Sequence, residues 1–252
     1  MVLVCQDPAF VFLKTTKTAG TSAEMALQSY CVPPGQTVLE DTETLETGYG
    51  IVGARGRKHV IQKAPRWKIW HDRGWYNHMP ASAVRKKLGA ARFDAATKIT
   101  SVRNPFDRMV SYFHFQKPEI SKTAGDFADI KAQFRDDVLA EEWSDDFWII
   151  EIDGQNVIDH IVRTEHIAED LRAVTNALEL DPARLSLPHT KDRRSHRKGH
   201  AVHEYFDPDT IAVIRRRMAW VFDLTDYPDA PIPSPETPQS AALEKVEEQV
   251  TP

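Results

Sequence analysis

A polar segment of nine residues, Lys14 to Ser22, lies between an apolar run and a stretch whose apolar residues have helical spacing. A turn that joins a buried strand to the start of a helix points several backbone N–H groups into one concavity, where the helix dipole adds positive potential. Such a turn suits a phosphate or sulfate group. Gly20 would let the backbone approach the anion closely, and Lys17 would add a positive charge. The other candidate contacts are Thr18, Ala19, Thr21 and Ser22. The alternative interpretation is a helix cap with incidental lysines.

A second candidate anion site begins at Arg103, which follows another strand-like run. Ligands of open α/β sheets bind at the carboxyl ends of the strands. Ser111 follows eight residues later, about two turns into the next helix. An arginine fork with a nearby hydroxyl would hold a phosphate. Arg108, between them, is predicted to be a solvated helix residue.

The glycine and lysine of the first segment occur in an order that argues against one nucleotide-binding class. The P-loop of nucleotide triphosphatases has the spacing G-x-x-x-x-G-K-[ST], whereas here the lysine precedes the glycine. A kinase-like phosphotransferase is therefore disfavoured. No cluster of His, Cys and Asp has metal-ligand spacing, so no metal is expected.

Strand signals alternate with helix signals, which predicts an α/β fold with a central parallel sheet flanked by helices. Asn104 is expected to cap a helix that begins at Pro105, and Pro80 to occupy the first position of another. Residues 32–56 are predicted to be irregular surface. The predicted strands are 9–13, 98–102 and 157–164, and the other predicted helices are 21–30, 80–88, 127–142, 166–179 and 208–222.

Composition limits the class of protein. The 252 residues contain 41% hydrophobic and 27% charged residues, which excludes global disorder. The formal net charge of −5 gives no overall attraction for nucleic acid. No run approaches the ~20 apolar residues of a membrane span, and no signal peptide is recognisable, so we expect a soluble cytoplasmic chain. Two cysteines allow at most one disulfide. Proline-rich, acidic residues 228–252 are expected to form a disordered tail after a single domain, 1–227.

The segments KTAGTS and SVRNPFDRMVSYF, in this order, resemble the PAPS-dependent sulfotransferase superfamily. The similarity is closest to the carbohydrate branch, which includes the uronyl and heparan 2-O enzymes and bacterial relatives. It implies a fold related to nucleotide kinases and 3′-phosphoadenosine 5′-phosphosulfate (PAPS) as sulfuryl donor, with PAP as product. The resemblance places the 5′-phosphosulfate at Lys17 to Ser22 and the 3′-phosphate at Arg103 and Ser111. One departure is Thr16, because many members have Pro before the loop lysine.

The resemblance also suggests a general base. Relatives often have His-x-Pro-Ala before a helix, and His78 to Ala81 fits that pattern. A histidine has a suitable pKa for taking a proton from an acceptor hydroxyl, and Lys17 would stabilise the leaving group. Some related enzymes use a glutamate soon after the first loop, which keeps Glu40, Glu43 and Glu46 as alternatives.

Two basic regions could bind ligands or simply be solvated. Arg197 and Lys198, followed by Gly199, resemble an Arg-Lys-Gly triplet that contacts the 3′-phosphate in cytosolic relatives. Between residues 55 and 76, basic side chains alternate with aromatic ones that could grip an anionic sugar chain, although packing is the favoured interpretation. The acidic stretch 136–153 is predicted to be an amphipathic cover without chemistry.

The leading hypothesis is an O-sulfotransferase that acts on a hydroxyl of a carbohydrate or glycoconjugate. The alternatives are a kinase-like phosphotransferase and a non-catalytic PAP-binding protein. The sequence specifies neither the acceptor nor the oligomeric state.

Overall fold

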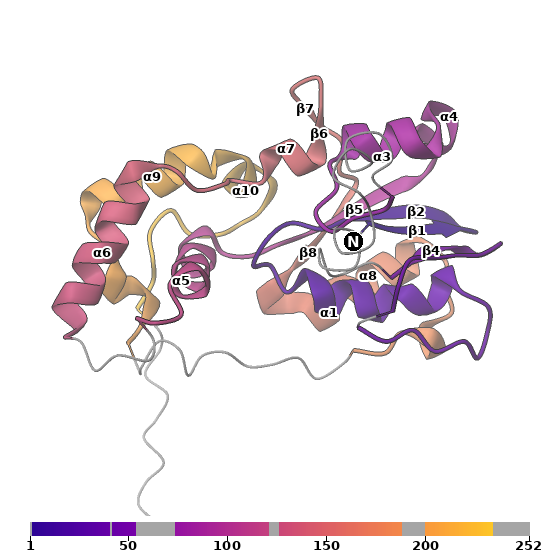
Figure 1. Cartoon of the computed structure of the whole chain (residues 1–252), viewed down its shortest axis with the longest axis horizontal. Coiled ribbons are helices and arrows are strands. Elements are labelled where there is room, and N and C mark those ends of the chain that lie inside the picture. The colour runs from indigo at the N-terminus through magenta and orange to yellow at the C-terminus, as the bar shows by residue number, and fades with distance from the viewer. Residues whose placement is uncertain (1, 41, 54–73, 121–125, 188–199, 234–252) are drawn as a thin grey trace, which may run out of the picture.

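The computed structural model describes residues 2–40, 42–53, 74–120, 126–187 and 200–233 (Figure 1). Its main sheet has six strands in the order β3-β4-β1-β2-β5-β8, and a two-stranded sheet contains β6 and β7. The strands are β1 Val2–Gln6, β2 Ala9–Leu13, β3 Leu45–Glu46, β4 Gly50–Val52, β5 Thr97–Val102, β6 Glu151–Ile152, β7 Gln155–Asn156 and β8 His160–Arg163. The helices are α1 Gly20–Leu27, α3 Ala81–Leu88, α4 Ala90–Ala95, α5 Pro105–Gln116, α6 Phe127–Ala140, α7 Phe147–Ile150, α8 Ile167–Ala177, α9 Pro208–Arg217 and α10 Ala219–Leu224. Short 3-10 helices are η1 Gln28–Cys31, η3 Thr164–His166, η4 Pro182–Arg184 and η6 Val202–Tyr205.

The α/β class is confirmed, but the sheet is mixed rather than parallel throughout. β2, β5 and β8 run parallel, whereas β1 is antiparallel to both β2 and β4. β1 had no counterpart among the predicted strands, and β3 and β4 lie in a segment predicted to be irregular. A hairpin explains the difference, because antiparallel strands need only a two-residue turn, here Asp7 and Pro8, whereas parallel strands need a long crossover.

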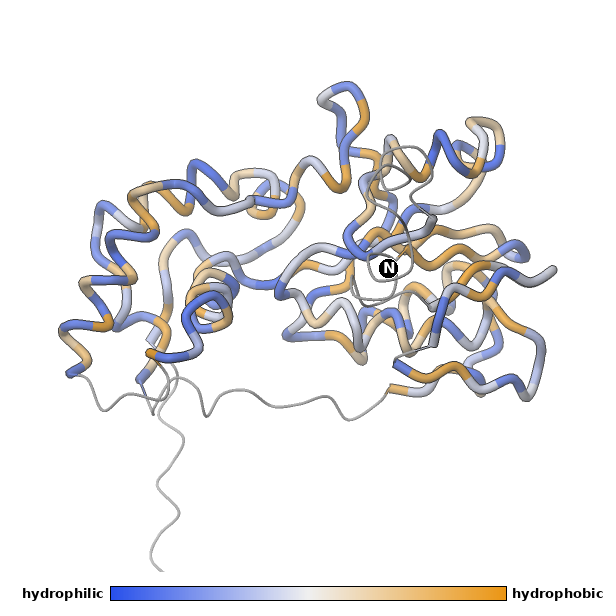
Figure 2. Tube along the Cα trace, in the orientation of Figure 1, coloured by the Kyte–Doolittle hydropathy of each residue, from blue (hydrophilic) through white to orange (hydrophobic). Residues whose placement is uncertain are grey.

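Alternating side chains give the sheet two apolar faces. Phe10 and Phe12 of β2 pack with Leu27 of α1, while Val11 and Leu13 pack against the opposite layer, which contains Val84 of α3. Figure 1 shows α1 and α8 on one side of the sheet and α3 on the other. The strands are predominantly hydrophobic in Figure 2, as burial on both faces requires.

Helices α5, α6, α9 and α10 form a separate group beside the sheet (Figure 1). Its core includes Phe106, Phe113, Phe134 and Ile214. The helix predicted over 208–222 is divided into α9 and α10 at Met218. Asn104 caps α5 as predicted, because its side-chain oxygen accepts hydrogen bonds from the backbone N–H groups of the first turn.

Among the described helices, none combines the length and apolar character needed to cross a bilayer. Cys5 and Cys31 are buried and are not joined in a disulfide. The carboxyl ends of the parallel strands β2 and β5 lie at one edge of the sheet, since Leu13 pairs with Thr100. Both predicted anion sites follow directly from these ends.

Candidate active site

The turn between β2 and α1, residues 14–19 and hereafter the Lys17 turn, has an unusual backbone. Lys17 (φ 63°) and Ala19 (φ 50°) are left-handed, and Thr18 between them is not. Left-handed residues in such an alternation can aim successive N–H groups toward one side, which is the arrangement of known anion-binding concavities. α1 begins at Gly20, and the first N–H groups of a helix have no partner within it. The Lys17 turn therefore presents backbone donors at a helix N-terminus, as an anion site requires.

Lys14 occupies the interior behind this turn. The residue is 5% exposed, and its Nζ donates hydrogen bonds to Thr21 Oγ1 (2.7 Å) and Glu24 Oε2 (3.2 Å). A Cβ on Gly20 would lie 2.7 Å from Lys14 Cγ. Gly20 thus makes room for the Lys14 side chain, which is a reason for a glycine here that the sequence did not reveal.

The hydroxyl groups of the turn are divided between packing and possible ligand contact. Thr18 Oγ1 is buried and forms hydrogen bonds with Thr15 Oγ1 (2.9 Å) and Ser101 Oγ (2.8 Å), which tie the turn to β5. Thr21 Oγ1 accepts from Lys14, so its own O–H proton is available to another acceptor. Ser22 is buried, and its backbone N–H donates to the carbonyl of Ala19 (2.8 Å). The Thr18 hydroxyl accordingly stabilises the turn, and we do not assign it to ligand contact.

Lys17 extends toward α5. Its Nζ lies 4.3 Å from the ring centroid of Phe115, a cation–π contact, and Phe115 is 56% exposed. Lys17 is half-buried, in contrast with the buried Lys14.

Arg103 lies beside the Lys17 turn. Its Nη1 donates to the carbonyl of Lys17 (3.4 Å), and its Nε donates to Asp107 Oδ2 (2.5 Å). Asp107, Ser111 and Phe115 are spaced four residues apart on α5 and therefore share one face. Since Asp107 contacts Arg103 and Phe115 contacts Lys17, Ser111 lies between the two places where this face meets the predicted sites. The structure thus brings Lys17, Arg103 and Ser111 to one edge of the sheet.

His78 also touches the start of the Lys17 turn. Its Nδ1 is 2.9 Å from the carbonyl oxygen of Lys14, which can only accept, so Nδ1 carries the proton and Nε2 keeps its lone pair. Burial lowers the pKa of His78 below the ordinary 6.5; the hydrogen bond to Lys14 opposes this shift, and the nearby Lys14 charge adds to it. A neutral imidazole with its lone pair on Nε2 is the form that a general base needs.

The three glutamates considered as alternative bases lie in the segment between η1 and β4. Glu40, Glu43 and Glu46 are exposed, and Glu46 accepts a hydrogen bond from the indole of Trp75 (2.7 Å). Trp75 is buried in the core, in agreement with the packing interpretation. Arg197 and Lys198 lie outside the described residues.

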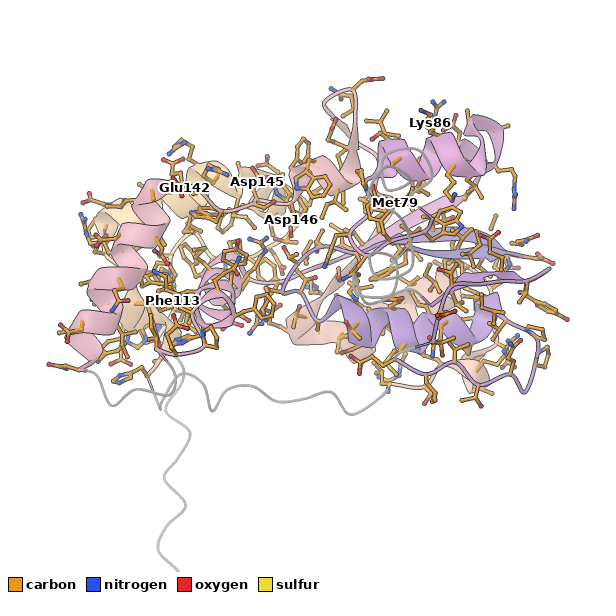
Figure 3. All side chains as sticks on the ribbon, in the orientation of Figure 1. Met79, Lys86, Phe113, Glu142, Asp145 and Asp146 are labelled. Carbon is orange, nitrogen blue, oxygen red and sulfur yellow. The ribbon has the colours of Figure 1, made fainter. Side chains whose placement is uncertain are left out.

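Sequence reasoning missed a buried ion pair. Arg108, predicted to be solvated, is only 2% exposed, and its Nη2 lies 2.8 Å from Asp146 Oδ2. Asp146 is 1% exposed and belongs to the stretch predicted to carry no chemistry. Figure 3 shows Asp146 between the sheet and the helical group, whereas Glu142 lies farther out along the helical group. The position of Arg108 next to the apolar residues Met109 and Val110 was a signal that could have been followed. Asp146 gave no such signal, because several other acidic residues lie near it in the sequence.

Within the part of the chain that the structure describes, no group of three or more His, Cys, Asp and Glu side chains is arranged to hold a metal ion. The sequence matches a family model described as the sulfotransferase family over residues 1–228. No curated protein and no solved structure gives a significant match.

Proposed function

Because the chain belongs to the sulfotransferase family, a family of group-transferring enzymes, we propose that it moves a sulfuryl group from PAPS to a hydroxyl of a carbohydrate or glycoconjugate. The observation that carries this proposal is the contact between the Arg103 guanidinium and the Lys17 carbonyl. PAPS has negative groups at both ends of one adenosine, and a contact between residues of the two candidate anion sites supports a single ligand that reaches both.

The residues fit such a cofactor. The backbone donors and Lys17 suit the 5′-phosphosulfate, which supplies the sulfuryl group when bound. Arg103 and Ser111 suit the 3′-phosphate, which distinguishes PAPS from nucleotides with 5′-phosphates alone. Arg103 is paired with Asp107, an arrangement that fixes the orientation of its guanidinium group.

The chain's own residues then divide the chemistry. Lys17 neutralises charge that develops on the leaving phosphate oxygen. His78 takes the proton of the acceptor hydroxyl at Nε2, while its Nδ1–H donates a hydrogen bond to the Lys14 carbonyl and so orients the ring. The turn holds the donor in place so that the acceptor hydroxyl can approach in line.

The test combines binding with turnover. We expect calorimetry to show PAP binding that weakens when either phosphate is absent, as in 5′-AMP or 3′-AMP, and radiolabelled PAPS to transfer sulfate to members of a glycan panel. The variant Lys86→Ala, which alters an exposed lysine on α3, serves as a control and should behave like the wild type. Preference for ATP with Mg²⁺ would overturn the proposal in favour of a phosphotransferase, and PAP binding without transfer to any acceptor would indicate a non-catalytic binding protein.

A further inference from the structure

We propose that Arg108 and Asp146 are positioning residues that hold the Lys17 turn, through Thr16, in the shape that receives the 5′ end of the cofactor. The cofactor assignment in this inference rests on the proposed function, whereas the hold on the turn is visible in the protein alone.

Every polar group of Thr16 is engaged by this pair. The backbone N–H of Thr16 donates to Asp146 Oδ2 (2.6 Å), and its hydroxyl donates to the same oxygen. Arg108 Nε donates to the Thr16 carbonyl (3.0 Å), and its Nη2 donates to Thr16 Oγ1 (3.0 Å). Thr16 is thus fixed on both sides of its Cα.

The position of Thr16 gives this contact its consequence. Its carbonyl belongs to the planar peptide group that leads into Lys17, so fixing that carbonyl restricts the backbone at Lys17. Lys17 is left-handed without being a glycine, a conformation that persists only where the surroundings enforce it. A turn held in advance also spares the ligand the cost of ordering it.

The pair itself is firmly supported. Ser144 Oγ donates to Asp146 Oδ1 (2.9 Å), and the Ser144 carbonyl accepts from Arg108 Nη2 (3.0 Å). Arg108 also approaches Met218, between α9 and α10 (Nη1 to sulfur 3.7 Å). The ion pair therefore connects the Lys17 turn to the helical group, although Asp146 is 130 residues from Thr16 in the sequence.

A set of variants separates this role from general stability. Asp146→Asn removes the charge, and Thr16→Val removes the hydroxyl while leaving the Arg108–Asp146 pair intact. Thr16→Ser keeps the hydroxyl and should behave like the wild type. Glu142→Gln makes the corresponding acid-to-amide change at an exposed site near Asp146 in the sequence and is the matched control. Should Asp146→Asn fail to fold, Thr16→Val still decides the question.

The first measurement is calorimetric affinity for PAP and for 3′-AMP. We expect Asp146→Asn and Thr16→Val to weaken PAP binding about tenfold or more, which corresponds to about 1.4 kcal/mol, and to leave 3′-AMP binding unchanged. This result would mean that the variants weaken only the part of the binding that depends on the 5′-phosphate. Equal losses for both ligands, or unchanged PAP affinity, would overturn the inference.

The second measurement needs no ligand. In hydrogen exchange, both variants should accelerate exchange of the backbone amides at residues 16–20 and leave those of α6 at the wild-type rate. Unchanged exchange rates in the Lys17 turn would overturn the inference that Arg108 and Asp146 hold it. If the wild-type protein binds no PAP, the proposed function fails, while the exchange rates still decide whether the ion pair holds the turn.

Discussion

At the residue scale, the two lysines of the Lys17 turn have different environments and should have different roles. Lys14 is buried against Glu24, whereas Lys17 reaches the exposed ring of Phe115. We predict that Lys17→Ala lowers kcat by about 100- to 1,000-fold, because the charge that Lys17 meets develops in the transition state. PAP affinity should fall by less than about tenfold. Steady-state kinetics beside calorimetry would show this split, and equal minor losses in both would contradict the role.

His78 has a pH signature. Burial lowers its pKa below 6.5, so the base form persists into mildly acidic solution. We predict that kcat/KM stays constant from neutral pH to below pH 6.5 and then falls as the imidazole is protonated. His78→Ala should lower kcat about 100- to 10,000-fold and abolish this acidic limb. Near-normal turnover in the variant would move the base elsewhere, and Glu46→Gln is the comparison because it alters an exposed alternative.

Pattern alone could indicate some of these residues but not others. Lys17, Arg103 and the Asn104 cap follow from strand ends and helix starts, which are local features. Asp146 acts on Thr16, from which it is separated by 130 residues, so no local signal announces it. Thr16 is the position where many family members have proline, and in this structure its N–H, hydroxyl and carbonyl groups are hydrogen-bonded to Arg108 and Asp146.

At the scale of elements, the start of α1 depends on Gly20. A Cβ there would lie 2.7 Å from Lys14 Cγ and 3.1 Å from Ser101 Oγ. Lys14 cannot easily move away, because its Nζ is held by Thr21 and Glu24. We predict that Gly20→Ala lowers the free energy of unfolding by about 1–3 kcal/mol despite the better helix propensity of alanine.

Urea denaturation would measure the Gly20 effect. Gly48→Ala is the matched control, because nothing lies within 4 Å of a Cβ there and its φ is not in the left-handed range. An equally large effect at Gly48, or a stabilised Gly20→Ala variant, would contradict the packing argument.

The main elements were predictable where their apolar pattern was strong and continuous. β2, β5, α6 and α8 match the predicted ranges to within a few residues, and α5 begins at Pro105 as predicted. β3 and β4 have two and three residues, too few for a pattern. They form because β1 offers an edge with which β4 pairs, and β4 in turn pairs with β3. The break between α9 and α10 likewise depends on packing that spacing does not report.

At the scale of the whole molecule, buried carboxylates set the response to acid. Burial alone would raise the pKa of Asp146, but Arg108 and Thr16 outweigh it and hold that pKa below 3.8. Burial is outweighed in the same way at Asp170 by hydrogen bonds from Arg163. Such groups contribute stability above their unfolded pKa, and this is lost as pH falls through the folded value. We predict a steep decline of the unfolding free energy below about pH 4, with a smaller one below about pH 6.5 from His78.

Urea denaturation at a series of pH values would measure how the free energy of unfolding declines in acid. Asp170→Asn should lower the unfolding free energy at pH 7 by about 1–3 kcal/mol and flatten the acid slope. Asp226→Asn, which alters an exposed partner of the same arginine (Nη1 to Oδ1 3.4 Å), should do neither. A slope unaffected by Asp170→Asn would show that acid unfolding arises from other groups.

The C-terminal part of the matched region contacts the residue that follows Arg103, in the second candidate anion site. Tyr227 donates its hydroxyl proton to Glu165, whose other oxygen accepts from the backbone N–H of Asn104 (3.0 Å), the residue after Arg103. Burial and the neighbouring Glu165 charge raise the pKa of Tyr227, so this donor keeps its proton. The family match covers residues 1–228 and so includes this contact.

Tyr227→Phe should therefore change the two ligand affinities differently from Asp146→Asn, which is expected to weaken PAP binding alone. Because it loosens the Arg103 end, we predict that affinity for 3′-AMP and for PAP falls by the same few-fold factor, with an unfolding free energy lower by about 1 kcal/mol. A chain ending at residue 233 keeps this contact and should bind both ligands as the full chain does. If shortening the chain to residue 233 weakens binding as much as Tyr227→Phe, residues beyond the proposed 1–227 domain take part in the site, and the boundary must be moved.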